Sequence, residues 1–268
     1  MNPEHRQELA LLSAMARELC AWEEDLGGAG IPAGAAEPIA SEGSRPTEPA
    51  SRRAEAPRSA APSSSSPEST PPTSNPSLPP DGRRRELEVL AEEAKTCTRC
   101  VLHEGRTKSV FARGNPESEL CFVGEGPGFN EDKQGLPFVG RAGKLLDKMI
   151  VAMGYQPSDV YICNVVKCRP PNNRTPLPGE AAACRPYLSG QLALVKPKLI
   201  VALGRCAAEH LGCLGDNPRG WRGRWSVYEG IDVMPTYHPA FLLRNENLKR
   251  PVWQDLKKVM AKLRGVGS

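Results

Sequence analysis

Four cysteines from two separated parts of the chain have the types and spacing of a metal site. Cys97 and Cys100 form a Cys-x2-Cys pair, and Cys168 and Cys184 follow further along the chain. Four thiolates could enclose either zinc or an iron-sulfur cluster, and their spacing does not distinguish the two. The alternative is four unrelated buried thiols, whereas a disulfide framework is not expected in a chain of this kind. The remaining cysteines are interpreted as small apolar residues: Cys20, Cys121, Cys163, Cys206 and Cys213.

A glycine-rich segment, GEGPGFNEDKQGLPFVGRAG, spans Gly124–Gly143 and would let a ligand approach bare main chain. It does not match a phosphate-binding P-loop, because Arg141 and Ala142 stand where Lys and Ser or Thr are required. It fits the dinucleotide fingerprint poorly, because Phe129 occupies the place of the third glycine. Of the ligands that such a loop suggests, a flat base is the one left.

The elements that would position these residues alternate between strand and helix. Apolar runs predict strands over 119–126, 159–168 and 197–204, and a hairpin or strand pair over 225–239. Helices are expected over 83–97, 142–155, 178–196, 205–213 and 252–265. This order predicts an α/β fold, a three-layer α/β/α sandwich with a central, mainly parallel sheet of about four strands. Ligands bind such sheets at the carboxyl ends of strands, where the glycine-rich segment, Asn164 and His238 all fall.

Composition divides the chain into three regions. Residues 1–26 carry an apolar stripe at helical spacing and predict an amphipathic helix, which would either bind a partner protein or fold back on its own domain. Residues 27–82, rich in Pro, Ser and Ala, predict a disordered linker, and residues 83–268 form the predicted folded domain. No segment resembles a signal peptide or a membrane span, so we expect a cytoplasmic, nucleoid-associated prokaryotic monomer with no membrane partner.

Charge divides along the same boundary. Residues 81–268 hold 29 basic and 20 acidic side chains, whereas residues 1–80 hold 6 and 11. A basic folded part favours a polyanionic partner such as nucleic acid. Scattered charge on a soluble surface is the alternative explanation.

Three motifs and the four cysteines together resemble family 4 uracil-DNA glycosylases. The motifs are GEGPGFNEDKQGLPFVGRAG, NVVKCRPPNNRTP and YHPAFLLR, and the resemblance covers residues 86–264. It implies the α/β/α fold of uracil glycosylases and a [4Fe-4S] cluster on Cys97, Cys100, Cys168 and Cys184. It also implies a partner, DNA that contains uracil, and a reaction, hydrolysis of the bond between uracil and its sugar.

The chemistry of uracil gives roles to several residues of these motifs. Uracil has an acceptor at O4 and a donor at N3, and the carboxamide of Asn164 offers the complementary pair. Cytosine has the opposite pattern and would leave buried polar groups unpaired, at about 1–3 kcal/mol for each. This edge is hidden in a duplex, so the nucleotide must be flipped out or taken from single-stranded DNA. Phe138 would then stack on the base, unless it is a core residue behind the loop.

Other roles follow from the resemblance. The main chain at Gly126 would face the uracil rim, and Glu131 would exclude the 5-methyl group of thymine. His238 would donate to O2 of the leaving base, with a structural loop residue as the alternative. Glu125 and Asn173 would position water, because Gly126 lacks the carboxylate that related family 1 enzymes have there.

The third motif also predicts contacts with DNA. Leu242 or Leu243 would fill the stack that the flipped nucleotide leaves, and Arg244 would bind a phosphate. The alternative is that these leucines form the first turn of a buried helix.

The chain departs from the family pattern at several positions. Phe129 and Asn130 stand where acidic residues are common, Gly126 where Ala is frequent, and Ala240 where Ser is common. These departures bear on substrate range, so a glycosylase for another deaminated base is one alternative. A non-catalytic DNA-binding or polymerase-associated module is the other.

Overall fold

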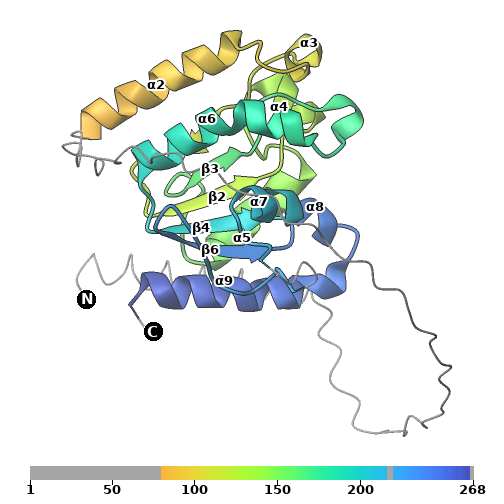
Figure 1. Ribbon diagram of the computed structural model, residues 1–268. Coiled ribbons are helices and arrows are strands. Elements are labelled where there is room, and N and C mark those ends of the chain that lie inside the picture. Colours follow the sequence, from red (N-terminus) through yellow and green to blue (C-terminus); the bar gives the residue numbers. More distant parts are fainter. Residues whose placement is uncertain (1–79, 216–219, 266–268) are drawn as a thin grey trace, which may run out of the picture. The chain divides into compact units, whose positions relative to one another are not determined.

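The computed structural model describes residues 80–215 and 220–265, and Figure 1 shows their arrangement. The predictions for residues 1–26 and for nearly all of the linker lie outside the described residues. The folded domain begins with helix α2 (Pro80–Thr96), slightly before the predicted boundary at Arg83. Within residues 80–215 and 220–265, none of the helices has the length and apolar character that a bilayer span requires.

One mixed sheet runs through the domain in the strand order β1-β3-β2-β4-β6-β5. The four central strands are parallel: β3 (Tyr161–Asn164), β2 (Leu120–Gly124), β4 (Leu199–Leu203) and β6 (Ile231–Thr236). The two edge strands are antiparallel to their neighbours: β1 (Ala112–Gly114) and β5 (Ser226–Tyr228). The predicted parallel centre and the hairpin are therefore confirmed. Strand β1 was missed because three half-exposed residues carry too little pattern.

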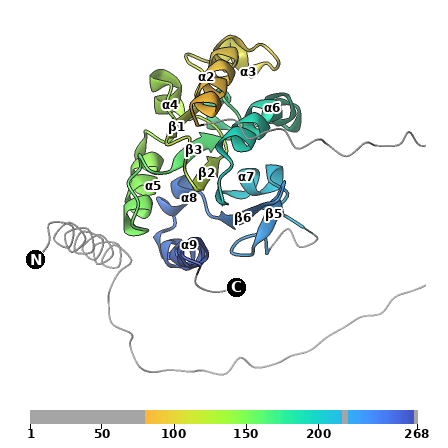
Figure 2. The ribbon, with the colours of Figure 1, turned by 90° about the vertical axis from the view of Figure 1, so that its left-hand side faces the viewer.

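Alternate residues of the central strands face two separate cores. Cys121 and Val123 of β2 belong to one core, and Leu120 and Phe122 belong to the other. The first core is covered by α2, α6 (Pro178–Val195) and α7 (Arg205–His210), and the second by α5 (Arg141–Ala152) and α9 (Lys249–Leu263). Figure 2 shows these helices on opposite sides of the sheet, which confirms the predicted three-layer sandwich.

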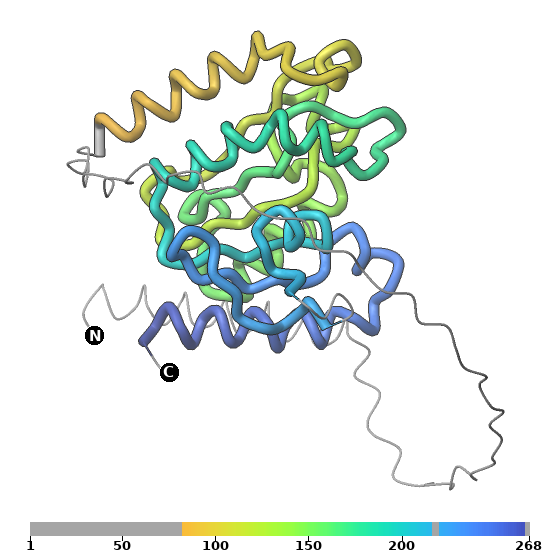
Figure 3. Tube along the Cα trace, viewed as in Figure 1, coloured from red at the N-terminus to blue at the C-terminus, as the bar shows by residue number. Residues whose placement is uncertain are grey.

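Helix α2 lies beside α6 and brings the first cysteine pair to the domain (Figure 3). The hydroxyl of Tyr187, on α6, donates to the carbonyl of Glu93 on α2 at 3.3 Å. Cys97 directly follows α2, and the short helix α3 (Leu102–Gly105) begins soon after Cys100. The pairing of α2 with α6 therefore positions the Cys97–Cys100 turn against the rest of the fold.

Short elements that the periodicity did not predict occupy the carboxyl-end loops. These are α4 (Phe129–Gln134), η1 (Pro171–Asn173), α8 (Pro239–Leu242) and η2 (Glu246–Leu248). Helix α4 lies inside the glycine-rich segment and ends at Gly135, whose φ of 80° suits glycine. One or two helical turns are too short to produce a recognisable period.

A buried carboxylate joins α9 to the end of β6. Asp255, 2% exposed, accepts from the hydroxyl of Thr236 at 2.6 Å and forms an ion pair with Arg222. Thr236 is the last residue of β6 and precedes the Tyr237–His238 segment by one position. This network therefore holds the strand end from which His238 projects.

We predict that Asp255→Ala lowers the free energy of unfolding by about 3 kcal/mol, the lower end for loss of one partner of a buried ion pair. The hydroxyl of Thr236 and the guanidinium of Arg222 would both lose their acceptor. Urea unfolding followed by circular dichroism measures the change. The matched control is Glu117→Ala, which removes an exposed ion pair with Arg84 and should change the value by less than about 1 kcal/mol. Equal effects of the two substitutions would contradict the anchoring role.

Candidate active site

An open cavity of about 470 Å³ lies where β2, β3 and β6 end. It is lined by the residues that the sequence analysis selected for substrate binding and catalysis: Glu125, Gly126, Glu131, Phe138, Asn164, Asn173, His238 and Arg244. These residues come from three motifs far apart in the chain, and the structure brings all of them to one site. Their individual roles remain predictions.

Asn164, at the end of β3, presents an unpaired acceptor in this cavity. The residue is 2% exposed, and its side-chain Oδ1 is buried without a hydrogen-bond partner. A buried acceptor without a donor is unfavourable, so the site is suited to a ligand that brings an N–H or O–H group. The sequence predicted the position of this residue but not its unsatisfied state.

Gly124 leaves the space in which Asn164 and Phe138 meet. It pairs with Asn164 across the parallel strands β2 and β3. A Cβ atom at Gly124 would lie 2.4 Å from Oδ1 of Asn164 and 2.4 Å from the Phe138 ring. Glycine is therefore required here by the close approach of two side chains rather than by a turn.

Phe138 is held in an uncommon backbone conformation. Its φ is 55°, in the left-handed region that non-glycine residues rarely adopt. Arg113 on β1 donates to the carbonyls of Pro137 at 2.9 Å and Phe138 at 3.4 Å, which fixes this conformation. The ring is 6% exposed and lies 5.5 Å from the His238 ring, with an angle of 30° between the two planes. Phe138 therefore belongs to the hydrophobic core and lines the cavity at the same time.

Glu131 supports the loop that carries Phe138. One carboxylate oxygen, Oε1, accepts from the backbone N–H groups of Val139 at 2.9 Å and Gly140 at 2.8 Å. Exclusion of a methyl group is the only role that the sequence predicts for Glu131, and this contact is additional to it. These hydrogen bonds could not be predicted from the sequence, because they join a side chain of α4 to backbone groups in the irregular loop that follows it.

His238 is held as a neutral imidazole. Burial lowers its pKa from 6.5 to about 4, and Arg244 acts in the same direction while Glu131 opposes it. The backbone N–H of Ala240 donates to Nδ1 at 3.1 Å, so Nδ1 carries no proton. The proton of the neutral ring is therefore on Nε2, which makes Nε2 a hydrogen-bond donor.

Glu125, directly after β2, and Asn173, in η1 of the loop after β3, both line the cavity. Burial raises the pKa of Glu125 above 4.5, and a hydrogen bond with Thr175 partly offsets this. Asn173 accepts from Arg169 at 2.7 Å through Oδ1, so its amide N–H groups are the part left for a ligand or water. A raised pKa makes the Glu125 carboxylate a stronger base than an ordinary glutamate.

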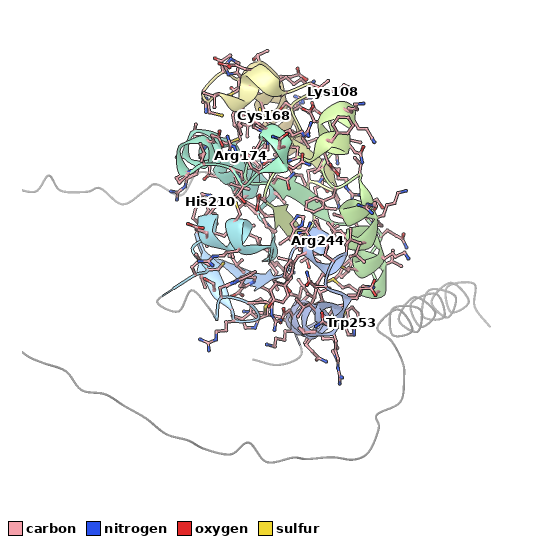
Figure 4. All side chains as sticks on the ribbon, turned by 90° about the vertical axis from the view of Figure 1, so that its right-hand side faces the viewer. Lys108, Cys168, Arg174, His210, Arg244 and Trp253 are labelled. Carbon is pink, nitrogen blue, oxygen red and sulfur yellow. The ribbon has the colours of Figure 1, made fainter. Side chains whose placement is uncertain are left out.

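Arg174 is a cavity residue that the sequence analysis missed. It forms two hydrogen bonds to the buried carboxylate of Glu180, at 2.8 and 2.6 Å, and this pairing holds the pKa of Glu180 below 4.5. Glu180 also accepts from the N–H of Leu177 at the start of α6. Arg174 belongs to the loop after β3 and Arg244 to the turn after α8, and both are labelled in Figure 4. The sequence feature that could have indicated this pairing is Glu180, because a Glu at the third position of a helix is typical of helix starts.

The prediction for Leu242 is wrong. Leu242 ends α8 and is 0% exposed, packed in the core with α5 and α9 residues, so it cannot enter a duplex from this position. The alternative that this segment is the first turn of a buried helix is correct for Leu242. Leu243 and Phe241 are 42% and 38% exposed, and Leu243 remains the candidate wedge.

A second, much smaller cavity of about 20 Å³ is lined by all four predicted metal ligands. Cys97 and Cys100 come from the turn after α2, Cys168 from the loop after β3, and Cys184 from α6. Burial raises the pKa values of Cys168 and Cys184, and Arg106, 3.4 Å from the Cys168 sulfur, opposes the first of these shifts. In the described part of the chain, no group of three or more His, Cys, Asp or Glu side chains is placed to hold a single metal ion.

Comparisons with known proteins give the same assignment as the motifs. The family model of the uracil DNA glycosylase superfamily matches residues 111–257. A type-4 uracil-DNA glycosylase of Thermotoga maritima is 45% identical over 195 residues, covering 69% of this chain and 98% of that protein. Type-4 uracil-DNA glycosylases of Sulfurisphaera tokodaii and Saccharolobus solfataricus are 47% and 42% identical; each aligned stretch covers 65% of this chain, and 83% and 84% of those proteins.

We predict that the His238 ring does not titrate between pH 8 and pH 5 and has its midpoint near the value of about 4 set by burial. Because the folded pKa lies below the unfolded one, the stability from this group is complete above pH 6.5 and is lost as pH falls towards 4. The ring resonances in two-dimensional NMR measure the midpoint. The His238→Gln variant identifies them. A midpoint at pH 6 or above would contradict the neutral imidazole.

Proposed function

We propose that this chain, which belongs to the uracil DNA glycosylase superfamily and to its type-4 group, releases uracil from DNA and leaves an abasic site. The reaction is hydrolysis of the N-glycosidic bond, as expected of a monofunctional glycosylase in base excision repair. The observation that carries the proposal is the buried, unpaired Oδ1 of Asn164 in a cavity that also contains a neutral His238. This arrangement offers an acceptor for N3–H of uracil and a donor for O2 of the same base.

Recognition rests on the carboxamide of Asn164. In the proposed complex, Oδ1 accepts from N3–H of uracil and the amide nitrogen donates to O4. Cytosine would place an acceptor against the orphan Oδ1 and a donor against the amide N–H groups, leaving buried groups unpaired at about 1–3 kcal/mol for each. The Phe138 ring would stack on the base, and the main chain at Gly126 would lie at its rim. Glu131 would meet the C5 edge through the carboxylate oxygen that does not bind Val139 and Gly140.

Departure of uracil leaves negative charge on the base, chiefly at O2 and O4. The Nε2–H of a neutral His238 would donate to O2 and stabilise this charge in the transition state. The low pKa of the ring means that the base leaves as an anion stabilised by a hydrogen bond, since no imidazolium proton is present to transfer at neutral pH. The Ala240 N–H keeps the proton on Nε2.

The attacking water would lie between Glu125 and Asn173. A carboxylate with a raised pKa accepts a proton more readily, and the amide N–H groups of Asn173 would orient the water oxygen. No carboxylate is present at Gly126, where related family 1 enzymes have an aspartate. Stabilisation of the leaving base would therefore supply more of the rate than deprotonation of water.

We infer that the cysteine cavity holds a [4Fe-4S] cluster. Such a cluster is bound through four separate thiolates around a void, and all four cysteines line one cavity rather than converging on a point. The cluster would supply a structural cross-link between the Cys97–Cys100 turn, the loop after β3 and α6. Arg106 supports this, since it also donates to the carbonyls of Cys97 and Lys95 at 2.6 Å each.

Access to uracil requires that the nucleotide leave the duplex or come from a single strand. Leu243, exposed after α8, would occupy the vacated stack, and Arg244 at the cavity would bind an adjacent phosphate. A protein partner of residues 1–26 and a monomeric state remain predictions.

The decisive test is release of free uracil from a uracil-containing oligonucleotide by the purified, metal-loaded protein, compared with hypoxanthine and xanthine substrates. We expect uracil release and a loss of about 10²–10³-fold in kcat for His238→Gln, the usual effect of removing one donor to a developing anion. The control is His210→Gln, at the end of α7 and outside the cavity, which should retain full activity. An active His238→Gln variant would refute its role, and release of another base alone would favour the alternative glycosylase.

We also predict that Gly124→Ala abolishes uracil binding while the protein still folds. The added methyl group would lie 2.4 Å from both Oδ1 of Asn164 and the Phe138 ring, so the base and these side chains cannot all fit. Inhibition by free uracil and the KM for DNA measure the effect. Gly105→Ala is the control, because nothing lies within 4 Å of its Cβ position. Unchanged uracil inhibition would show that the slot is not where we place it.

A further inference from the structure

Lys167 is a buried cation without a carboxylate partner. The residue is 1% exposed, yet none of the ion pairs found among the described residues includes it. Its Nζ donates to the backbone carbonyl of Asn164 at 2.6 Å and lies 5.8 Å from the Phe111 ring centre. One carbonyl and one ring do not neutralise a full charge, so burial of this ammonium calls for an anion nearby.

The cysteine cavity is the place from which such an anion would come. Lys167 lines this cavity together with the four predicted metal ligands. Its backbone N–H donates to the sulfur of Cys184 at 3.3 Å, and the next residue is Cys168. Thiolates that bind a metal are deprotonated, and four of them give the bound group a net negative charge. The metal-loaded site therefore supplies the counter-charge that the ammonium lacks.

The same side chain reaches the residue that reads the base. Asn164 and Lys167 are three positions apart, and the bond from Nζ to the Asn164 carbonyl closes the turn between them. The carbonyl of Lys167 accepts in turn from the N–H of Val110 at 2.8 Å, which holds this turn against the segment before β1. The backbone of Asn164 is therefore fixed at its carboxyl side by a lysine that also lines the cavity of the four predicted metal ligands.

We propose that Lys167 is a positioning residue that couples the metal site to base recognition. Its ammonium is the counter-charge of the metal-bound thiolates and, by the same placement, orients the carboxamide of Asn164 toward uracil. Loss of the metal would leave the ammonium without an anion, and the turn that carries Asn164 would rearrange. The part of the proposal that concerns uracil rests on the proposed function, and the part that concerns metal binding does not.

The test compares Lys167→Met, which keeps the length of the side chain and removes its charge, with Lys148→Met on the exposed face of α5. We expect Lys167→Met to lose iron to a chelator about 10–100-fold faster than the wild type, the usual effect of removing a group that supports metal ligands. We also expect a more negative reduction potential of the bound cluster, because a positive charge that favours the added electron is gone. Lys148→Met should match the wild type in both measurements.

Kinetics test the second half of the proposal. Per bound cluster, Lys167→Met should raise KM for uracil-DNA by about 10–100-fold and lower kcat far less, since Asn164 contacts the base before and during the reaction. Lys167→Arg, which keeps the charge but not the ammonium geometry, should retain iron like the wild type and still show the raised KM. Iron retention and potential equal to the wild type in Lys167→Met would overturn the counter-charge role. An unchanged KM would overturn the coupling.

Three further outcomes bear on the proposal. Cys163→Ala tests the fully buried Cys163 thiol as the alternative anion. Fast iron loss in this variant as well would overturn the assignment to the metal-bound thiolates.

If Lys167→Met does not fold, the wild type stripped of metal replaces it. The KM for uracil-DNA should then rise before circular dichroism shows unfolding, and an unchanged KM would refute the coupling. If the wild type releases no uracil, the proposed function fails, and iron loss from Lys167→Met compared with Lys167→Arg still decides the metal half.

Discussion

The parallel pairing of Gly124 with Asn164 is the contact on which the site depends. At this register the side chain of Asn164 and the ring of Phe138 share the space where Gly124 has no side chain. A base-sized slot can form here only because Gly124 has no Cβ atom to occupy the space between Asn164 of the second motif and Phe138 of the first. The neutral His238 ring, whose centroid is 5.5 Å from that of Phe138, lines the same cavity. The register that pairs Gly124 with Asn164 therefore determines both the strand pairing and the shape of the candidate site.

Cations hold the loops around this slot, and most of them act on backbone carbonyls or buried carboxylates. Arg113 binds the carbonyls around Phe138, Arg174 binds Glu180, and Arg222 binds Asp255 below the strand that leads to His238. Arg106 acts in the same way at the cysteine cavity. Hydrogen bonds from charged donors are stronger than neutral ones, which suits irregular segments that lack a ladder of their own. The basic character of the folded part is therefore partly structural, in addition to any attraction for DNA.

The two cavities are separate in space but share one short segment of chain. Asn164 ends β3, Lys167 lies in the turn that follows, and Cys168 lines the cysteine cavity. The proposed metal would touch no substrate atom, yet one of its ligands and the proposed base-recognition residue lie on this one segment. The loop that follows also carries Asn173 and Arg174. The proposed coupling of metal binding to recognition would therefore act through the backbone.

The sequence by itself determined the layer architecture and the parallel centre, and it identified the four cysteines and most of the candidate active-site residues, because apolar runs and motif spacing are local properties of the chain. It could not assign Leu242, since exposure of one residue in a four-residue helix depends on what packs against it. It could not find the contacts of Glu131 and Arg174, which join residues across irregular loops. Only the tertiary structure shows that Oδ1 of Asn164 has no donor, that His238 is neutral and that Lys167 has no carboxylate partner among the described residues. Each of these depends on which groups surround a side chain in space, and therefore on burial and not on spacing.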